Sequence, residues 1–177
     1  NGWVLSPEFN FSSFGLYDSL VVELDIWYDL ENGVDGVVLQ SSIDGGISWQ
    51  NVGELDIEST INLYTNNNIS AIPGNQSTGW SGVSENMFSD GWKKAVFNIG
   101  NFYYSGVGAG LTGELSVYFR IAFASNSSIE SDGFAFDNFR VTQNICYTGE
   151  DASYDICTVN ESGQTPYETN LFDFLVD

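Results

Sequence analysis

The sequence predicts an all-β protein that folds as an antiparallel jelly-roll β-sandwich. Several segments alternate apolar and polar residues with a period of two, which is the pattern of a strand with one buried face. No stretch of convincing length shows the helical period. Long polar connections rich in Gly, Ser and Asn separate the alternating segments, as they do in sandwiches with Greek-key connections.

The strands can be placed one by one. The clearest alternation begins at Leu20, and the next apolar run follows a turn at Asp35-Gly36. Residues 51–90 show little regular alternation, so we expect a long excursion there that bears function or insertions. In chain order, strands are predicted at residues 20–28, 37–41, 93–99, 117–123 and 134–141.

We expect residues 1–141 to form the sandwich and residues 142–177 to form a C-terminal extension or linker. The composition changes after Val141, where acids cluster and the two cysteines occur. In a secreted protein Cys146 and Cys157 are expected to form a disulfide that closes a small loop. The final apolar run, residues 171–176, fits an edge strand, an anchoring linker or the start of another domain.

Charge narrows the range of partners. The chain has 24 acidic residues, 4 basic residues and no histidine, so its formal net charge is −20. This balance argues against nucleic acid and anionic membranes as partners, because both require clustered Lys and Arg. No apolar stretch is long enough to predict membrane insertion. The charge favours divalent cations, a saline habitat, or both.

Catalysis has weak support in the sequence. A chain without histidine has no Ser–His or Cys–His pair and no His-based metal site. Paired carboxylates could serve glycoside hydrolysis, but among so many acids such a pair carries no information. We therefore expect a protein that is not an enzyme.

The segment around Asp137 suggests a bound metal ion. If a period of two runs through residues 134–141, Asp137 shares the inward face with Phe139 and Val141. A buried carboxylate needs a cation or several hydrogen-bond donors, and Arg140 lies on the opposite face of the same strand. Ca²⁺, which binds oxygen ligands, is one solution, and donation from turn amides is the other. The predicted calcium ligands are Asp137, Glu8 and Asp35, followed by Asp132 and Asn138.

Residues 42–49 match the Asp-box pattern S-x-D-x-G-x-[ST]-W. The pattern, which begins at Ser42, predicts a hairpin in which Asp44 accepts hydrogen bonds from turn amides, Gly46 adopts a positive φ, and Trp49 closes the base. Asp boxes are best known as repeats in sialidase propellers. A single copy weighs against a propeller, and we expect this motif to fold a turn without touching a substrate.

Aromatic residues outside the alternating strands are candidates for ligand binding. Exposed aromatic rings stack on sugar faces, and Trp80 in the irregular excursion is the best candidate, with Tyr64 as a second. The alternative is that these rings close the ends of the sandwich.

Several short motifs in a fixed order resemble the MAM-like jelly rolls of bacterial surface proteins and secreted peptidases. The cleaved-adhesin-type domains of gingipain-like proteins and the reelin subrepeats are similar. The motifs are the opening Trp3–Phe9, the Asp35-Gly36 turn, the Asp box, Gly91-Trp92, the strand Arg120–Phe123 and the segment Gly133–Asn138.

The resemblance covers roughly residues 3–141 and implies a jelly roll with structural calcium, in a non-catalytic module of a larger secreted or cell-surface protein. The strand expected before Trp3 is absent, so another segment, such as the tail, is needed to fill the gap. We expect adhesion to a glycan or a cell-surface protein, with neighbouring domains of the same polypeptide as further partners. The alternatives are an accessory domain of a secreted metallopeptidase or glycoside hydrolase, and a spacer repeat of a surface fibre.

Overall fold

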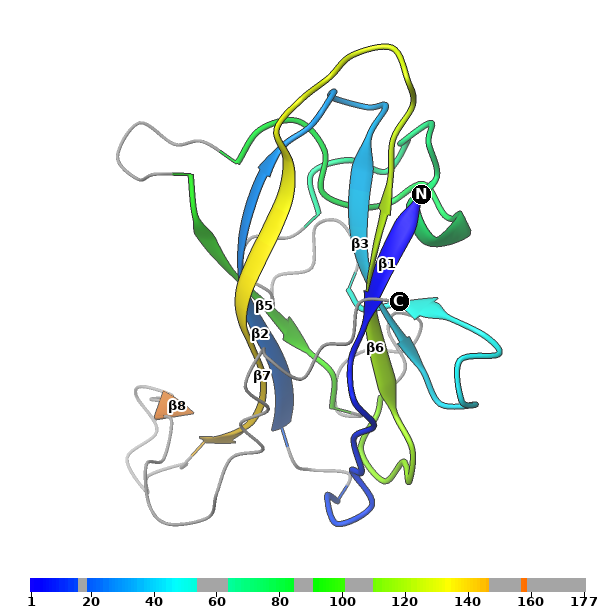
Figure 1. Cartoon of the computed structure of the whole chain (residues 1–177). Coiled ribbons are helices and arrows are strands. Elements are labelled where there is room, and N and C mark those ends of the chain that lie inside the picture. The colour runs from blue at the N-terminus through cyan, green and yellow to red at the C-terminus, as the bar shows by residue number, and fades with distance from the viewer. Residues whose placement is uncertain (16–18, 54–63, 85–90, 101–109, 147–156, 159–177) are drawn as a thin grey trace.

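The computed structural model describes residues 1–15, 19–53, 64–84, 91–100, 110–146 and 157–158. Two antiparallel sheets pack against each other, and the described residues contain one short 3₁₀ helix and no α-helix (Figure 1). The elements are β1 (Gly2–Leu5), β2 (Ser19–Asp29), β3 (Gly36–Ser42), β4 (Gln50–Asn51), η1 (Pro73–Asn75), β5 (Lys93–Asn98), β6 (Tyr118–Ala124), β7 (Gly133–Cys146) and β8 (Cys157–Thr158).

The strand order confirms the predicted antiparallel sandwich. Sheet 1 has the order β1-β6-β3-β4, and sheet 2 has the order β5-β2-β7-β8. The connections β2–β3 and β6–β7 both cross from one sheet to the other, while β2 pairs with β7 and β3 pairs with β6. An antiparallel ribbon is thus folded across the two layers, which is the jelly-roll arrangement.

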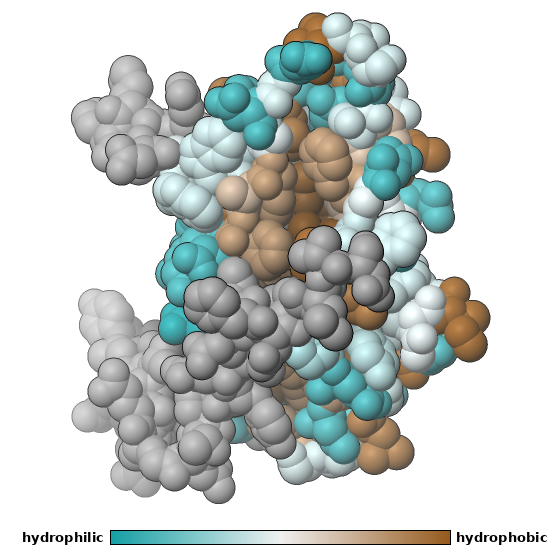
Figure 2. Space-filling model, in the orientation of Figure 1, coloured by the Kyte–Doolittle hydropathy of each residue, from teal (hydrophilic) through white to brown (hydrophobic). Residues whose placement is uncertain are grey.

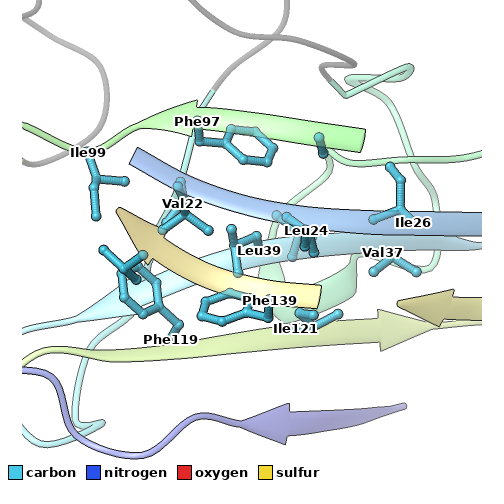
Figure 3. Packing of buried hydrophobic residues seen from close by; sticks show 14 of the residues in the cluster. Val22, Leu24, Ile26, Val37, Leu39, Phe97, Ile99, Phe119, Ile121 and Phe139 are labelled. Carbon is cyan, nitrogen blue, oxygen red and sulfur yellow. The ribbon is translucent and has the colours of Figure 1, made fainter. Parts of the chain in front are cut away.

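The core lies between the sheets, and the predicted alternation fills it. All five predicted strands form, as β2, β3, β5, β6 and β7, and their inward residues interdigitate (Figure 3). Each buried methylene stabilises the fold by about 0.8 kcal/mol, so this layer is the main source of stability. The labelled side chains in Figure 3 are Val22, Leu24, Ile26, Val37, Leu39, Phe97, Ile99, Phe119, Ile121 and Phe139.

A β-bulge in β7 overturns the predicted orientation of Asp137. Phe136 packs against the core before the bulge and Phe139 is buried after it, so the alternation changes phase between them. Asn138 has a φ of 52°, and the pairing with β2 shifts register at this point. Asn tolerates this left-handed conformation, which lets the strand take up an extra residue. Asp137 is therefore exposed, and its predicted inward position is wrong.

Strand β7 runs five residues past the predicted domain boundary at Val141 and pairs with β8. The backbone places Cys146 directly opposite Cys157. Opposed residues of an antiparallel pair have Cα atoms about 4.5–5.5 Å apart, within the range that a disulfide spans. The side chains of both cysteines lie outside the described residues, as do residues 147–156 and 159–177. The disulfide and the role of the extension remain predictions.

The middle of the predicted excursion, residues 64–84, is folded against the sandwich. It pairs with β3 through a bridge between Val37 and Trp80, and η1 lies against the outer face of sheet 1, where Gln40 donates a hydrogen bond to the Gly74 carbonyl. A Cβ on Gly74 would lie 2.4 Å from the Gln40 side-chain oxygen, so glycine is needed for this approach. No helix in the described part of the chain is long and apolar enough to cross a membrane.

Candidate functional site

Trp80 and Tyr64, the predicted ligand-binding aromatics, belong to the core. Trp80 is 0% exposed, and its ring packs 5.0 Å from the Tyr64 ring and 5.8 Å from the Phe97 ring. The buried Tyr64 hydroxyl lies 2.9 Å from the Leu39 carbonyl oxygen and 2.7 Å from that of Val52. Burial raises the pKa of Tyr64 above its usual range. A sugar cannot reach either ring, so the predicted platform is wrong and the alternative, closure of the sandwich, holds.

The outer face of sheet 1 presents two tryptophan rings, those of Trp3 and Trp49, beside Arg120. Trp3 on β1 is 65% exposed, and the guanidinium carbon of Arg120 on β6 lies 5.8 Å from the centre of its ring. The Trp49 ring, beside β4, lies 4.2 Å from the same carbon. Leu5 is exposed directly opposite Arg120 in the β1–β6 register. We call the surface formed by Trp3, Leu5, Arg120 and Trp49 the tryptophan–arginine face.

A chain of side-chain amides holds Arg120 in place. Its Nε donates to Gln40 Oε1 at 2.9 Å, and Gln40 Nε2 donates to Asn51 Oδ1 at 3.1 Å. Asn51 Nδ2 in turn donates to Gln76 Oε1 at 2.8 Å. The chain links β6, β3, β4 and the loop after η1, so several rigid elements set the position of the guanidinium.

Arg120 is electrostatically unlike Lys94 and Arg140 of sheet 2. Burial lowers the pKa of Arg120, although a guanidinium stays charged at physiological pH. Lys94 forms ion pairs with Glu23 and Asp25, and Arg140 pairs with Glu23. Within the described residues Arg120 has no carboxylate partner, and its two terminal nitrogens donate no hydrogen bond.

The Asp box forms the predicted hairpin between β3 and β4. Asp44 accepts hydrogen bonds from the backbone N–H of Ser48 at 2.9 Å and from its hydroxyl at 2.6 Å. These bonds hold the pKa of Asp44 at about 2. Gly46 has the predicted positive φ, 87°, and its N–H donates to the Ser42 hydroxyl at 2.9 Å.

The hairpin also aims Trp49 at Arg120. The Trp49 indole N–H donates to the Gly46 carbonyl at 3.0 Å, which fixes the ring beside the guanidinium. Ile43 and Ile47 are exposed on the same hairpin, and Figure 2 shows hydrophobic surface where the hairpin projects. The motif thus folds a turn, as predicted, and also supplies one wall of the tryptophan–arginine face.

The predicted calcium ligands do not converge. Glu8 is exposed near the start of β6, whereas Asp35 is buried beside its end. Asp132 is exposed in the β6–β7 loop, and Asp137 and Asn138 are exposed on β7. Among the residues that the structure describes, no three acidic, histidine or cysteine side chains are grouped to hold a metal.

Protein donors already serve the acids at the bulge. Asp137 lies opposite Asp25 in the register, and like charges so placed repel. Asn138 Nδ2 donates to Asp25 Oδ2 at 2.7 Å, and the Lys94 ammonium lies 3.3 Å from Asp25 Oδ1. Burial acts to raise the pKa of Asp25, but these donors outweigh it and the pKa is lowered. The Asp137 carboxylate itself accepts the backbone N–H of Asn138 at 2.7 Å.

Oxygen atoms suited to calcium lie instead at the β2–β3 turn. The Glu31 Oε2 atom is buried and has no hydrogen-bond partner among the described residues. Asp35, four residues after Glu31 in the chain, is 4% exposed. Its carboxylate accepts a hydrogen bond from the Asn126 N–H at 3.0 Å. Figure 1 shows the β2–β3 turn and the β6–β7 loop at the same end of the sandwich. A buried carboxylate oxygen without a hydrogen-bond partner, in the same turn as a second, buried carboxylate, is of the kind that a hard cation binds.

No protein-family model matches the sequence, and no curated protein matches it. The candidate sites therefore rest on geometry. Sequence reasoning did not connect Arg120 with Trp3 or Trp49, because strand β1 was not predicted. The feature that could have predicted this face is the position of two tryptophans, Trp3 and Trp49, at or beside β1 and β4, the two edge strands of sheet 1.

Proposed function

We propose that this chain is a non-catalytic binding module of a secreted or cell-surface protein, and that it binds glycans through the tryptophan–arginine face. The observation that supports the proposal is the placement of Trp3 and Trp49 on either side of Arg120. Large aromatic rings are costly to leave in water, and a well-ordered exposed tryptophan is a common binding hot spot. A glycan ligand is consistent with the expected role in adhesion.

The chemistry of the face favours a sugar over a purely apolar partner. A pyranose has an apolar C–H face that stacks on an indole and hydroxyl groups at its rim that need hydrogen-bond partners. The face offers the open Trp3 ring, the Leu5 side chain and the guanidinium of Arg120. The strands and the amide chain hold these groups rigid, so little conformational entropy is lost on binding.

Trp3→Ala is expected to reduce affinity for a bound glycan about 30-fold or more, because loss of a hot-spot side chain costs on the order of 2 kcal/mol. The measurement is a glycan array of the whole chain, followed by calorimetry with the best ligand. Trp92→Ala is the matched control, since Trp92 is 44% exposed next to β5 in the other sheet. Absence of any glycan bound by the wild type, or equal losses in the two variants, would contradict the proposal.

A structural calcium ion is the second part of the proposal. Glu31 and Asp35 would supply carboxylate oxygens at the β2–β3 turn, and the Asn126 amide keeps the β6–β7 loop against the same turn. Calcium prefers six to eight oxygen ligands, so carbonyl groups and water would complete the shell. The ion would neutralise two carboxylates at one end of a chain with a net charge of −20.

Millimolar Ca²⁺ is expected to raise the melting temperature of the wild-type chain by several degrees, whereas Mg²⁺ is not. A ligand that binds only the native state stabilises it by about 2.7 kcal/mol at 100 times its dissociation constant. Glu31→Gln is expected to abolish the shift, and Asp132→Asn, an exposed acid of the β6–β7 loop, is expected to keep it. A wild type that melts identically in Ca²⁺ and in EDTA would remove calcium from the proposal.

The proposed extracellular location is supported by the cysteines. The register of β7 and β8 places Cys146 opposite Cys157, an arrangement that a disulfide can bridge in an oxidising compartment. A bond at this point would secure the short β8 strand to the end of β7.

A further inference from the structure

We infer that the ligand of the tryptophan–arginine face is an acidic saccharide whose uronate carboxylate pairs with Arg120, an inference that rests on the proposed glycan binding. A uronic acid combines a flat pyranose ring with a carboxylate fixed to its rim. The tryptophan–arginine face combines the exposed indole of Trp3 with the charged guanidinium of Arg120 beside it. The two arrangements match group by group.

The hydrogen bonds of Arg120 leave one side of its guanidinium open. The Nε atom is committed to Gln40, while the terminal nitrogens have no acceptor among the described residues. Two N–H groups of a guanidinium bind the two oxygens of a carboxylate in parallel, and these charge-assisted bonds are roughly twice as strong as neutral ones. A lysine ammonium does not provide the same geometry.

The surroundings of Arg120 also prepare it for an anion. The Trp49 ring lies 4.2 Å from the guanidinium carbon, and the Trp3 ring lies 5.8 Å away on β1. Indole rings hold a guanidinium by cation–π attraction and remove part of its hydration without neutralising its charge. An anion that arrives meets a cation that is already oriented and partly desolvated.

The distribution of acids supports the same reading. The chain has 24 acidic residues, and two of those described, Glu23 and Asp25, pair with Lys94 and Arg140 on sheet 2. None is within ion-pair distance of Arg120 in the described part of the chain. The guanidinium is complementary to a carboxylate at this one point, while the net charge of −20 opposes binding of a polyanion elsewhere on the surface.

The sugar ring is assigned to Trp3. Its ring is 65% exposed and belongs to an edge strand, so an extended polysaccharide has access from the open side of the sheet. Trp49 is more covered than Trp3, and its indole N–H donates to the Gly46 carbonyl of the hairpin. Trp3 therefore stacks on the pyranose, and Arg120 binds the carboxylate beside it.

The test compares one oligosaccharide in charged and neutral form. Oligogalacturonate and its fully methyl-esterified form share the same rings, and only the first has carboxylates. Calorimetry with the wild-type chain is expected to show at least 10-fold tighter binding of the acid. Equal affinity for the two forms, or tighter binding of the ester, would overturn the inference. An oligomannuronate tested in parallel shows whether the preference follows the carboxylate or one sugar.

Two substitutions that each remove one positive charge distinguish a local effect at Arg120 from the effect of the net charge of the chain. Arg120→Gln is expected to lose 10- to 100-fold in affinity for the acid and little for the ester, while Lys93→Gln, at the start of β5 in sheet 2, is expected to change neither. Arg120→Lys is expected to recover only part of the loss, because it restores charge without the fork. Similar losses in Arg120→Gln and Lys93→Gln would contradict a local carboxylate site.

The outcomes distinguish this inference from the proposed function. If the chain binds neutral glycans through Trp3 and shows no preference for the acid, glycan binding stands and the assignment of Arg120 fails. If no saccharide of either form binds, both fail. The comparison of acid with ester uses the wild-type chain alone, so it decides the matter even if Arg120→Gln does not fold.

Discussion

Trp80→Ala is expected to lower the free energy of unfolding by about 3–5 kcal/mol, the range measured when a large buried aromatic is truncated. Trp80 is fully buried, and its ring packs against Phe97 on β5 and Phe134 on β7, both in sheet 2. Its backbone N–H and carbonyl also pair with Val37 of β3. The substitution leaves a large cavity between the layers, and the strands on either side cannot close it.

A loss of this size is a large fraction of the 5–15 kcal/mol that stabilises an ordinary domain. The measurement is urea unfolding of the whole chain, in which the midpoint and the slope of the transition give the free energy of unfolding. Trp92→Ala serves as the control, because it removes the same side chain from a partly exposed site and is expected to cost much less. A Trp80→Ala variant as stable as Trp92→Ala would show that the ring does not join the two sheets.

The fold could be predicted from the sequence because its strands alternate locally. In β2 and β6 every second residue is apolar, and such a pattern has one inward face whatever the rest of the chain does. The Asp box was equally predictable, since Asp44 and Gly46 act within one turn. The core and this hairpin follow from contacts between residues that are close in the sequence.

The sites depend on features that no local pattern reports. The bulge at Asn138 moves Asp137 from the inward to the outward face, and only the pairing with β2 reveals it. Irregular sequence around Trp80 suggested a surface loop, yet the ring is held between the sheets. The tryptophan–arginine face brings together Trp3, Trp49 and Arg120, which are far apart in the chain and meet only through strand register.

Arg140→Ala is expected to destabilise the chain by about 1.5–3 kcal/mol, the range of hydrogen bonds to charged groups. Glu23 lies on the outer face of β2 and is only 8% exposed. Arg140 on the neighbouring strand reaches one oxygen of that carboxylate through Nε at 2.8 Å and Nη2 at 2.5 Å. Without Arg140 the carboxylate keeps, among the described residues, only the more distant Lys94 ammonium, 3.9 Å away. Because the arginine side chain is half-exposed, solvent screening favours the lower end of the range.

A double-mutant cycle separates the ion pair from the packing of the arginine stem. If the cost comes from an unpaired Glu23 carboxylate, Arg140→Ala is expected to cost under about 0.5 kcal/mol in a Glu23→Gln background. The glutamine amide is neutral, so removal of Arg140 then leaves no unpaired charge. If the cost comes from the aliphatic stem covering the sheet, it is expected to be the same in both backgrounds. The unfolding midpoint in urea decides between them. The first outcome would show that the arginines of the two sheets have different roles. Arg140 neutralises a carboxylate of its own chain, whereas the proposed role of Arg120 is to bind a carboxylate of a ligand.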